Sequence, residues 1–200
     1  MSRSTDAELV AQIRVASKRG SPSGPSTLAE DAFRVLLERY WKVVVVLAES
    51  RVQCRRDAED IAQEAFLRAW RSIDGLEKPK HFLGWLLTIV RNLSSDRLRR
   101  RKPMSSLDAM ESASDTIGDL KAASVESRFE RDEQWELVTR ALSDLPDRYR
   151  TVVILRYLRG FSSREMADSL GEPEGTIRNR LFRALAKLRD RLSTDALNQN

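Results

Sequence analysis

The sequence predicts an all-helical protein made of two small domains joined by a flexible acidic linker. Apolar residues recur every three or four positions over Asp31–Lys102 and again over Ser127–Leu192, which is the period of amphipathic helices. Between these segments, Pro103–Val125 is rich in Ser, Asp, Ala and Gly and has no clear period, as in a linker. A chain of 200 residues is long enough for one large domain or two small ones, and this break favours two.

The amino terminus is predicted to form a short helix, because Thr5 and Glu8 have the spacing of a capping box. Gly20–Ser26, with the sequence GSPSGPS, is rich in turn-forming residues and predicts a mobile loop. Together with the break after Lys102, these signals divide the chain into five segments. They are a short helix and mobile loop over 1–27, a first domain over 28–103, a linker over 104–126, a second domain over 127–193 and a tail over 194–200.

The composition argues against several classes of function. The net charge of +5 and the pI near 9.6 favour an anionic partner such as nucleic acid. A single Cys and a single His exclude an internal disulfide and argue against a zinc site or a Ser-His-Asp triad, so we predict no catalytic residue, no metal and no cofactor. The longest apolar run, Val43–Ala48, is far shorter than the roughly 20 residues that span a bilayer. Because a signal-peptide core is also missing, we expect a cytoplasmic protein without membrane insertion.

The first domain is predicted to be helical almost throughout. Val43–Val46 is β-branched and, taken alone, also fits a buried strand, but its flanks have helical period and favour a helix. In the next helix, a packing face is formed by Ala58, Ile61, Ala62, Ala65, Phe66, Ala69 and Ile73. The polar residues left on the other side are Asp57, Asp60, Gln63 and Glu64. This side is either solvated surface or a docking surface for a partner.

The stretch RNLSSDRLRRRKP, residues 91–103, ends an apolar helical segment with five Arg and one Lys, balanced only by Asp96. Such a run is either a solvated tail or the footprint of an acidic polymer such as nucleic acid. On a helical projection of Phe82–Lys102, the strip separate from the apolar arc holds Trp85, Thr88, Asn92, Ser95 and Arg99, with Asp96 at its margin. A ring, an amide and a guanidinium in one column can stack on an unpaired base and hydrogen-bond to its edge. Trp85 also fits partial packing into the core.

A helix-turn-helix is the sharpest local signal in the second domain. Ser162 and Glu165 form a second capping box, Gly171 suits the turn, and Pro173 suits the first turn of the next helix. With Ile177 filling the angle between the helices, this spacing predicts a helix-turn-helix. The side chains left to face outward include Arg178, Asn179, Phe182, Arg183 and Lys187. A recognition helix needs such groups to reach bases and phosphates in a major groove.

Three stretches together carry a family resemblance. They are DAEDIAQEAFLRAW (57–70), FLGWLLTIVRNLSSDRLRRRK (82–102) and LPDRYRTVVILRYLRGFSSREMADSLGEPEGTIRNRLFRALAKLR (145–189). These stretches resemble bacterial sigma factors of the sigma-70 type, in the compact extracytoplasmic-function (ECF) group. The resemblance implies that the first domain is the helical bundle called region 2 and the second is the helix-turn-helix domain called region 4. It also implies a sigma factor that directs promoter-specific transcription initiation, recognises −10 and −35 elements and melts the promoter.

The resemblance also implies partners and site residues. The partners are the β′ clamp helices and the β flap of core RNA polymerase, promoter DNA and an anti-sigma factor. The polymerase-docking motif matches Asp57, Asp60, Gln63, Glu64 and Phe66. The part of region 2 near the −10 non-template strand matches Arg91, Asn92, Asp96 and Arg99, to which the strip adds Trp85. The loop Asp74–His81 is expected to hold an extruded base. The candidates for −35 recognition are Thr176, Arg178, Asn179, Phe182, Arg183 and Lys187.

The acidic linker and two other classes of function complete the predictions. Ser105–Glu136 holds nine acidic and three basic residues, a charge that serves solubility or imitates nucleic acid inside the polymerase channel. A free-standing helix-turn-helix repressor or activator needs only residues 145–189, and it leaves 82–102 unexplained. A DNA-processing enzyme is disfavoured, because His, Cys and clustered inward carboxylates are scarce. A repressor binds its operator alone, whereas a sigma factor binds promoters well only with core polymerase.

Overall fold

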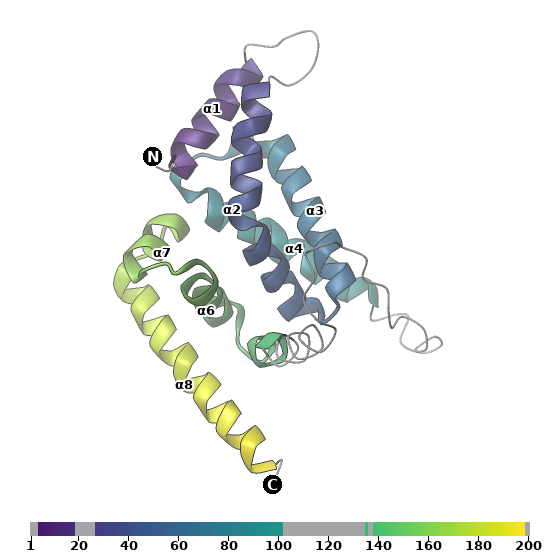
Figure 1. Ribbon diagram of the computed structural model, residues 1–200, viewed down its shortest axis with the longest axis vertical. Coiled ribbons are helices and arrows are strands. Elements are labelled where there is room, and N and C mark those ends of the chain that lie inside the picture. Colours follow the sequence, from purple (N-terminus) through teal and green to yellow (C-terminus); the bar gives the residue numbers. More distant parts are fainter. Residues whose placement is uncertain (1–3, 19–26, 102–134, 136–137, 199–200) are drawn as a thin grey trace, which may run out of the picture.

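The computed structural model describes residues 4–18, 27–101, 135 and 138–198, which form helices and no strand, so the all-α prediction is confirmed. The amino-terminal part contains α1 (Asp6–Lys18), α2 (Thr27–Val52), α3 (Arg55–Ser72), the 3₁₀ turns η1 (Ile73–Gly75) and η2 (Pro79–His81), and α4 (Phe82–Arg101) (Figure 1). A helical segment over 138–143 leads into α6 (Asp147–Arg159), α7 (Ser163–Leu170) and α8 (Glu174–Asn198). The predicted loop Gly20–Ser26 and the predicted linker 104–126 lie outside the described residues.

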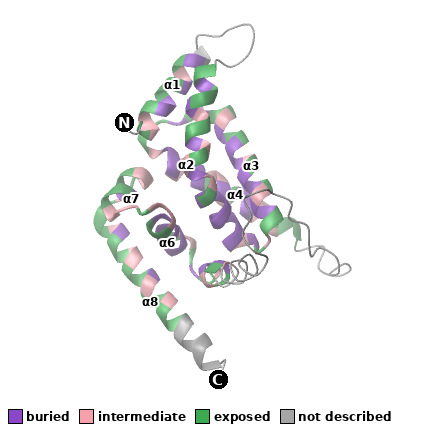
Figure 2. Ribbon diagram, in the orientation of Figure 1, coloured by how far each residue is buried: buried purple, intermediate pink, exposed green. Residues whose placement is uncertain are grey.

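The central helix of the molecule is α2, which packs against α1, α3, α4 and α6. All four residues of Val43–Val46 are buried within it, so the run is helical and the alternative strand does not form. Packing on several sides outweighs the weak helix propensity of β-branched residues. Figure 2 shows buried residues along α2, α3 and α4 and on α6. Within the described ranges, no helix has both the length and the apolar character needed to cross a bilayer.

The amino-terminal helix α1 is fixed to α2 by polar and apolar contacts. The predicted capping box is confirmed: the backbone N–H of Thr5 donates to Glu8 at 2.8 Å and that of Glu8 donates to Thr5 Oγ1 at 3.3 Å. Asp6 accepts hydrogen bonds from Arg39 at 2.5 Å and from the Tyr40 hydroxyl at 2.6 Å. These contacts join α1 to α2 across the segment Gly20–Ser26, so α1 packs as part of the first domain.

The predicted packing face of α3 is confirmed, with one exception at its start. Ala58, Ala62, Ala65 and Ala69 have no exposed surface, and such small side chains let α3 approach its neighbours closely. Asp57, which the helical projection leaves on the polar side, is instead only 4% exposed. The prediction of a free Asp57 is therefore wrong. Its cause is the basic end of α4, which lies against the first turn of α3 and forms ion pairs with this carboxylate.

The two domains are packed against each other, a contact that the sequence did not predict. α6 lies against α2, while α7 lies against α4 and η2 (Figure 1). The approach of α7 to α4 is close at Gly84, where an added Cβ would lie 3.3 Å from both Leu170 Cα and the Ser169 carbonyl oxygen. A side chain at position 84 would therefore require the backbone of α7 to move by a few tenths of an ångström.

Candidate functional site

The strip predicted to bind an unpaired base lies along α4. The opposite face of α4 is core, since Phe82, Leu86 and Val90 have no exposed surface. Trp85 is half-buried, with its ring centroid 6.0 Å from that of Phe82, so the alternative of partial packing holds for this ring. Farther along the helix, Asn92 and Arg99 are exposed. Arg99 forms an ion pair with Asp96, so these two members of the strip balance each other's charge.

The amino-terminal half of this strip faces the second domain. Trp85, Thr88 and Arg91 line a cleft of about 360 Å³ whose other wall comes from α6, α8 and the turn between α7 and α8. Arg91 donates to Thr88 Oγ1 at 3.0 Å and to the Leu87 carbonyl at 3.3 Å, which holds its guanidinium along α4. Of the −10 candidates, only Trp85 and Arg91 line this cleft. The opposite wall contributes Arg148 and an ion pair between Arg180 and Glu172.

The loop before α4, predicted to hold an extruded base, is braced by a residue of α1. Arg14 donates to the Ile73 carbonyl at 2.8 and 3.2 Å, to the Asp74 carbonyl at 3.2 Å and to the Leu76 carbonyl. One guanidinium thus satisfies three carbonyls of a single turn. The sequence analysis missed this contact, because no local pattern around Arg14 points to carbonyls about 60 residues away.

His81, at the end of this loop, lies against the turn of the helix-turn-helix. An added Cβ at Gly171 would lie 2.9 Å from His81 Cε1, and the φ of +72° at Gly171 also favours glycine. Partial burial lowers the pKa of His81, the neighbouring Lys80 and Lys78 lower it further, and Asp168 opposes them. The imidazole therefore favours its neutral form at this contact between the domains.

The polymerase-docking candidates divide into a polar side of α3 and an apolar groove beside it. Asp60 and Gln63 are exposed, and Glu64 is half-buried in an ion pair with Arg68 at 2.7 Å. Phe66 is only 2% exposed and lies in the wall of an open groove of about 510 Å³.

The apolar walls of this groove come from both α2 and α3. Their aromatic and aliphatic members are Phe33, Leu37, Trp41, Phe66, Leu67 and Trp70. Leu67 is half exposed, at 50%. Sequence reasoning did not identify this groove as a site. Leu67, an apolar residue beside the acidic motif and outside the packing face of α3, was a usable signal for it.

The helix-turn-helix forms as predicted. The backbone N–H of Ser162 donates to the Glu165 carboxylate at 2.8 Å and the Ser162 hydroxyl donates to it at 2.7 Å, and these two bonds lower the pKa of Glu165. The Glu165 N–H donates to Ser162 Oγ at 3.2 Å and completes the capping box. Ile177 has no exposed surface, in agreement with its predicted place between α7 and α8. Gly171 adopts a φ of +72° and ends α7.

The recognition helix α8 presents a basic outer face. Phe182 is 76% exposed, which is unusual for a large apolar side chain. Thr176 is half-buried near the start of α8, whereas the other −35 candidates are exposed: Arg178, Asn179, Phe182, Arg183 and Lys187. Arg178 lies 3.8 Å from Glu174, a loose and exposed ion pair that leaves its guanidinium accessible.

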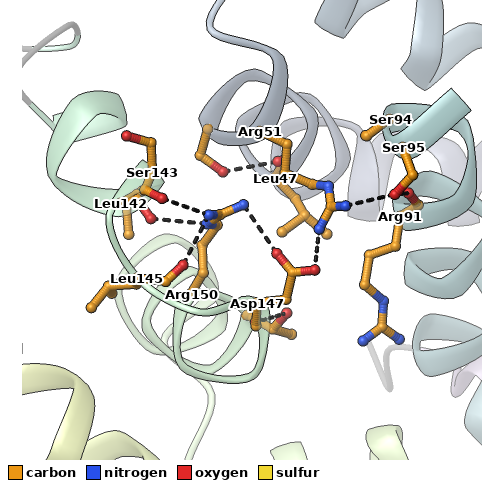
Figure 3. Close-up of polar contacts among 12 residues, drawn as sticks. Leu47, Arg51, Arg91, Ser94, Ser95, Leu142, Ser143, Leu145, Asp147 and Arg150 are labelled. Carbon is orange, nitrogen blue, oxygen red and sulfur yellow. Dashed lines mark hydrogen bonds and ion pairs between the residues drawn. The ribbon is translucent and has the colours of Figure 1, made fainter. Parts of the chain in front are cut away.

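An ionic cluster joins the two domains at the carboxyl end of α2. Arg51 forms an ion pair with Asp147 of α6 and donates to Ser95 Oγ of α4 at 2.9 Å (Figure 3). Asp147 also lies 3.2 Å from Arg150. Arg150 is buried and donates to the carbonyl oxygens of three residues, each at 2.9 Å: Leu142, Ser143 and Leu145. Burial lowers the pKa of Arg150, although Asp147 opposes this effect.

Comparison with known families gives two matches along the chain. The family described as Sigma-70 region 2 matches residues 36–103, which contain α3, α4 and most of α2. The family described as Sigma-70, region 4 matches residues 135–188, which contain the helix-turn-helix. The two families expected from the resemblance therefore match the chain, in the expected order.

Curated relatives and solved structures give the same result. The chain is 32% identical over 168 residues to the ECF RNA polymerase sigma factor SigW of Bacillus subtilis, covering 82% of this chain and 90% of the relative. It is 36% identical over 160 residues to the ECF RNA polymerase sigma-E factor of Escherichia coli K12, covering 78% and 83%.

Two solved structures have similar folds. CnrH in complex with the cytosolic domain of CnrY matches with a TM-score of 0.58 and 25% identity, covering 95% of this chain and 98% of that one. The sigma factor RpoE in complex with the anti-sigma factor NepR, from Bartonella quintana, matches with a TM-score of 0.52 and 27% identity, covering 82% and 98%.

Proposed function

Since this chain belongs to the ECF group of sigma-70-type RNA polymerase sigma factors, we propose that its first domain docks on polymerase and opens the −10 element, while its second domain binds the −35 element. Membership means that the chain binds RNA polymerase and directs promoter-specific transcription initiation. The family consists of initiation factors without a catalytic reaction of their own. The observation that carries the proposal is the order of the two matched regions, each with its predicted surface on a separate helical domain.

Docking on the polymerase uses the exposed side of α3 and the groove beside it. Asp60 and Gln63 offer polar contacts at the rim, and the groove offers an apolar centre into which a partner's aliphatic side chain fits. An apolar centre with a polar rim is the usual arrangement of protein interfaces. The partner surface is the β′ clamp helices. Asp57 acts here as a support for α4, because its carboxylate is buried beneath Arg97 and Arg101.

Promoter opening proceeds by capture of unstacked bases. The duplex opens transiently, and bases of one strand bind along α4, where Trp85 offers a half-buried ring and Asn92 and Arg99 offer polar groups. Each captured base contributes about 1–3 kcal/mol by stacking, which shifts the equilibrium toward the open form. The loop Asp74–His81 holds an extruded base. Phosphate contacts from the exposed Arg100 hold register without reading sequence.

The −35 element is bound by α8 in the major groove. Arg178, Asn179 and Arg183 supply exposed donors for base edges and phosphates. The exposed ring of Phe182 supplies an apolar surface on the same helix. The region between the two domains lies outside the described residues, and its sequence is acidic. We propose that this region imitates nucleic acid in the polymerase channel.

An anti-sigma factor is the remaining proposed partner. RpoE of Bartonella quintana was solved with the anti-sigma factor NepR, and the present chain covers 98% of that structure's sigma chain. A chain with the same fold and two packed domains offers an inhibitor contacts on both domains at once. The compartment proposed for all these contacts is the cytoplasm, where RNA polymerase acts.

Binding measurements with and without polymerase separate this function from that of a free-standing repressor. The chain alone should bind promoter duplex weakly, whereas the chain with core polymerase should bind it tightly and in competition with nonspecific DNA. Tight and sequence-specific binding by the chain alone, unchanged by polymerase, would instead identify a repressor or activator that uses only its helix-turn-helix.

A further inference from the structure

The contact between Arg51 and Asp147 lies beside the surface proposed to bind the −10 strand. Arg51 comes from the last turn of α2, yet its guanidinium donates to Ser95 Oγ of α4 at 2.9 Å. The Ser95 hydroxyl in turn donates to the Arg91 carbonyl at 2.9 Å. Arg51 therefore adds a cation to the side of α4 that holds Arg91 and Ser95, although no pattern in the sequence connects it with them.

The second domain supplies the anion that neutralises this cation. The side chain of Arg51 is only 12% exposed, and its ion-pair partner is Asp147, at the start of α6 (Figure 3). Its Nε atom is buried and has no hydrogen-bond partner among the described residues. If the domains separate, Arg51 loses its carboxylate and keeps only the neutral hydroxyl of Ser95. A guanidinium beside a hydroxyl is a good site for an anionic oxygen.

Asp147 is not required to satisfy its other neighbour. Arg150 donates to three carbonyl oxygens at 2.9 Å, so its hydrogen bonds remain when Asp147 is removed. The carboxylate of Asp147 is 39% exposed, whereas the side chain of Arg150 is 7% exposed. Asp147 also offsets part of the positive charge of the buried Arg150, so it serves both arginines.

Other contacts also join the two domains, and one of them lies on α4. Leu170 of α7 packs on Gly84, and Gly171 packs on His81. The guanidinium of Arg159 lies over the Tyr40 ring, 5.8 Å from its centroid, and joins α6 to α2. A strand laid along the amino-terminal half of α4 would meet α7, so DNA and the second domain compete for one surface.

We propose that Arg51 is a phosphate contact for the −10 strand and that Asp147 takes the place of this phosphate while the two domains are packed together. The second domain thus masks the −10 surface until polymerase draws the domains apart. The inference rests on the proposed −10 role of α4, and it adds a DNA contact on α2 together with the intramolecular anion that blocks it.

Binding of the free chain to single-stranded DNA tests the inference. The probe is a fluorescently labelled oligonucleotide of mixed sequence, about 12 nucleotides long. The variants of the full chain are Asp147→Asn, Arg51→Ala and the double variant. Asp144→Asn is the matched control, because it removes an ion pair with Arg191 inside the second domain. Helical circular dichroism checks folding, and Asp147→Ser serves as a second variant if Asp147→Asn fails to fold.

Masking predicts a specific order of affinities. Asp147→Asn should bind the oligonucleotide about fivefold or more tightly than the unchanged chain, which is the lower range of coupling between sites. Arg51→Ala in that background should remove the gain. It should also make the dependence of log affinity on log salt concentration less steep by about 0.7, because one phosphate contact is lost. The Asp144→Asn control should bind as the unchanged chain does.

Other outcomes overturn the inference in part or in whole. Equal affinities for Asp147→Asn and Asp144→Asn would show that Asp147 masks nothing. If the double variant binds as tightly as Asp147→Asn, with the same salt dependence, Arg51 is not a phosphate contact. Adding Arg91→Ala to Asp147→Asn tests the proposed −10 role separately. In the Asp147→Asn background, weaker oligonucleotide binding with Arg91→Ala but not with Arg51→Ala would refute only the role of Arg51. If Arg91→Ala has no effect, the proposed −10 role of α4 is itself refuted.

Discussion

Arg97 of α4 donates a hydrogen bond to Asp57, which lies 40 residues earlier at the start of α3. Arg101 adds a second ion pair to the same carboxylate. Both guanidinium groups are about half exposed, at 46% and 47%, whereas Asp57 is buried beneath them. The basic end of α4 is thus partly neutralised by α3, which reduces the charge repulsion expected of consecutive arginines.

Asp57→Asn should lower the free energy of unfolding by about 1–3 kcal/mol at neutral pH, because it removes charge-assisted hydrogen bonds. The hydrogen bond from Arg97 holds the pKa of Asp57 below its ordinary value; burial opposes this effect and Arg101 adds to it. The ionised carboxylate therefore stabilises the fold above its unfolded pKa of about 3.9, and this stabilisation is lost as the pH falls through the lower folded pKa. Denaturant titrations of both proteins over this range should converge in acid.

The exposed Asp60 provides the control for this measurement, because Asp60→Asn changes the same charge on the same helix without a buried partner. A free energy of unfolding that responds equally to both substitutions at neutral pH would contradict the structural role of Asp57.

Leu67→Asp should weaken binding to core polymerase by about tenfold or more, as expected for an anchor in an interface. Leu67 is 50% exposed at the groove between α2 and α3, so the charge would be placed in the contact without disturbing the core. Fluorescence titration of labelled chain with core polymerase measures the change. Val15→Asp on α1 is the control, since Val15 is 51% exposed and lies outside the groove. Equal losses for the two variants would exclude the groove as the docking surface.

Arg14→Ala should impair opening of the −10 element while core binding stays unchanged. Arg14 positions the turn that carries Ile73, Asp74 and Leu76, and its loss removes a donor from all three carbonyls, of which that of Ile73 keeps the Leu76 N–H. Permanganate reactivity of promoter thymines in the polymerase complex measures the opening. Arg14→Lys retains the positive charge and an ammonium group that can donate to a carbonyl, so this variant should retain part of the opening. Full opening with Arg14→Ala would show that the brace has no influence on promoter melting.

Arg183→Ala should cost about 1–3 kcal/mol of binding free energy on the preferred −35 sequence, if Arg183 contacts a base edge. The side chain is exposed on α8, next to Phe182, and interacts with the Tyr149 hydroxyl of α6. Competition binding of the polymerase complex to promoters that differ only in their −35 element measures the loss. A loss of the same size on every sequence would identify Arg183 as a phosphate contact.

Features encoded within one helix or one turn could be predicted from the sequence. The helix-turn-helix was predicted because Ser162, Gly171 and Ile177 each have a local role, namely capping, a positive φ and filling of the angle. The apolar face of α3 was predicted for the same reason. Helical period describes the face of one helix and not the neighbour that covers it, so it placed Asp57 wrongly.

Contacts between distant segments could not be predicted in this way. Arg51 and Asp147 are 96 residues apart, and Arg14 lies 59 residues from Ile73. No periodicity or short motif relates such residues, because their proximity depends on how helices cross in three dimensions. The apolar groove has the same origin, since Phe33 and Leu67 come from different helices. The packing of the two domains, which decides whether α4 is open to DNA, is of this kind as well.

We expect this one chain to bring core polymerase to a defined class of promoter. The most direct test is transcription in vitro by purified core polymerase, with only this chain added, on a library of genomic DNA fragments. We expect RNAs with a small set of defined 5′ ends, preceded by a shared pair of sequence elements, and none when the chain is left out. If the chain neither binds the polymerase nor yields a single defined 5′ end, the account is contradicted.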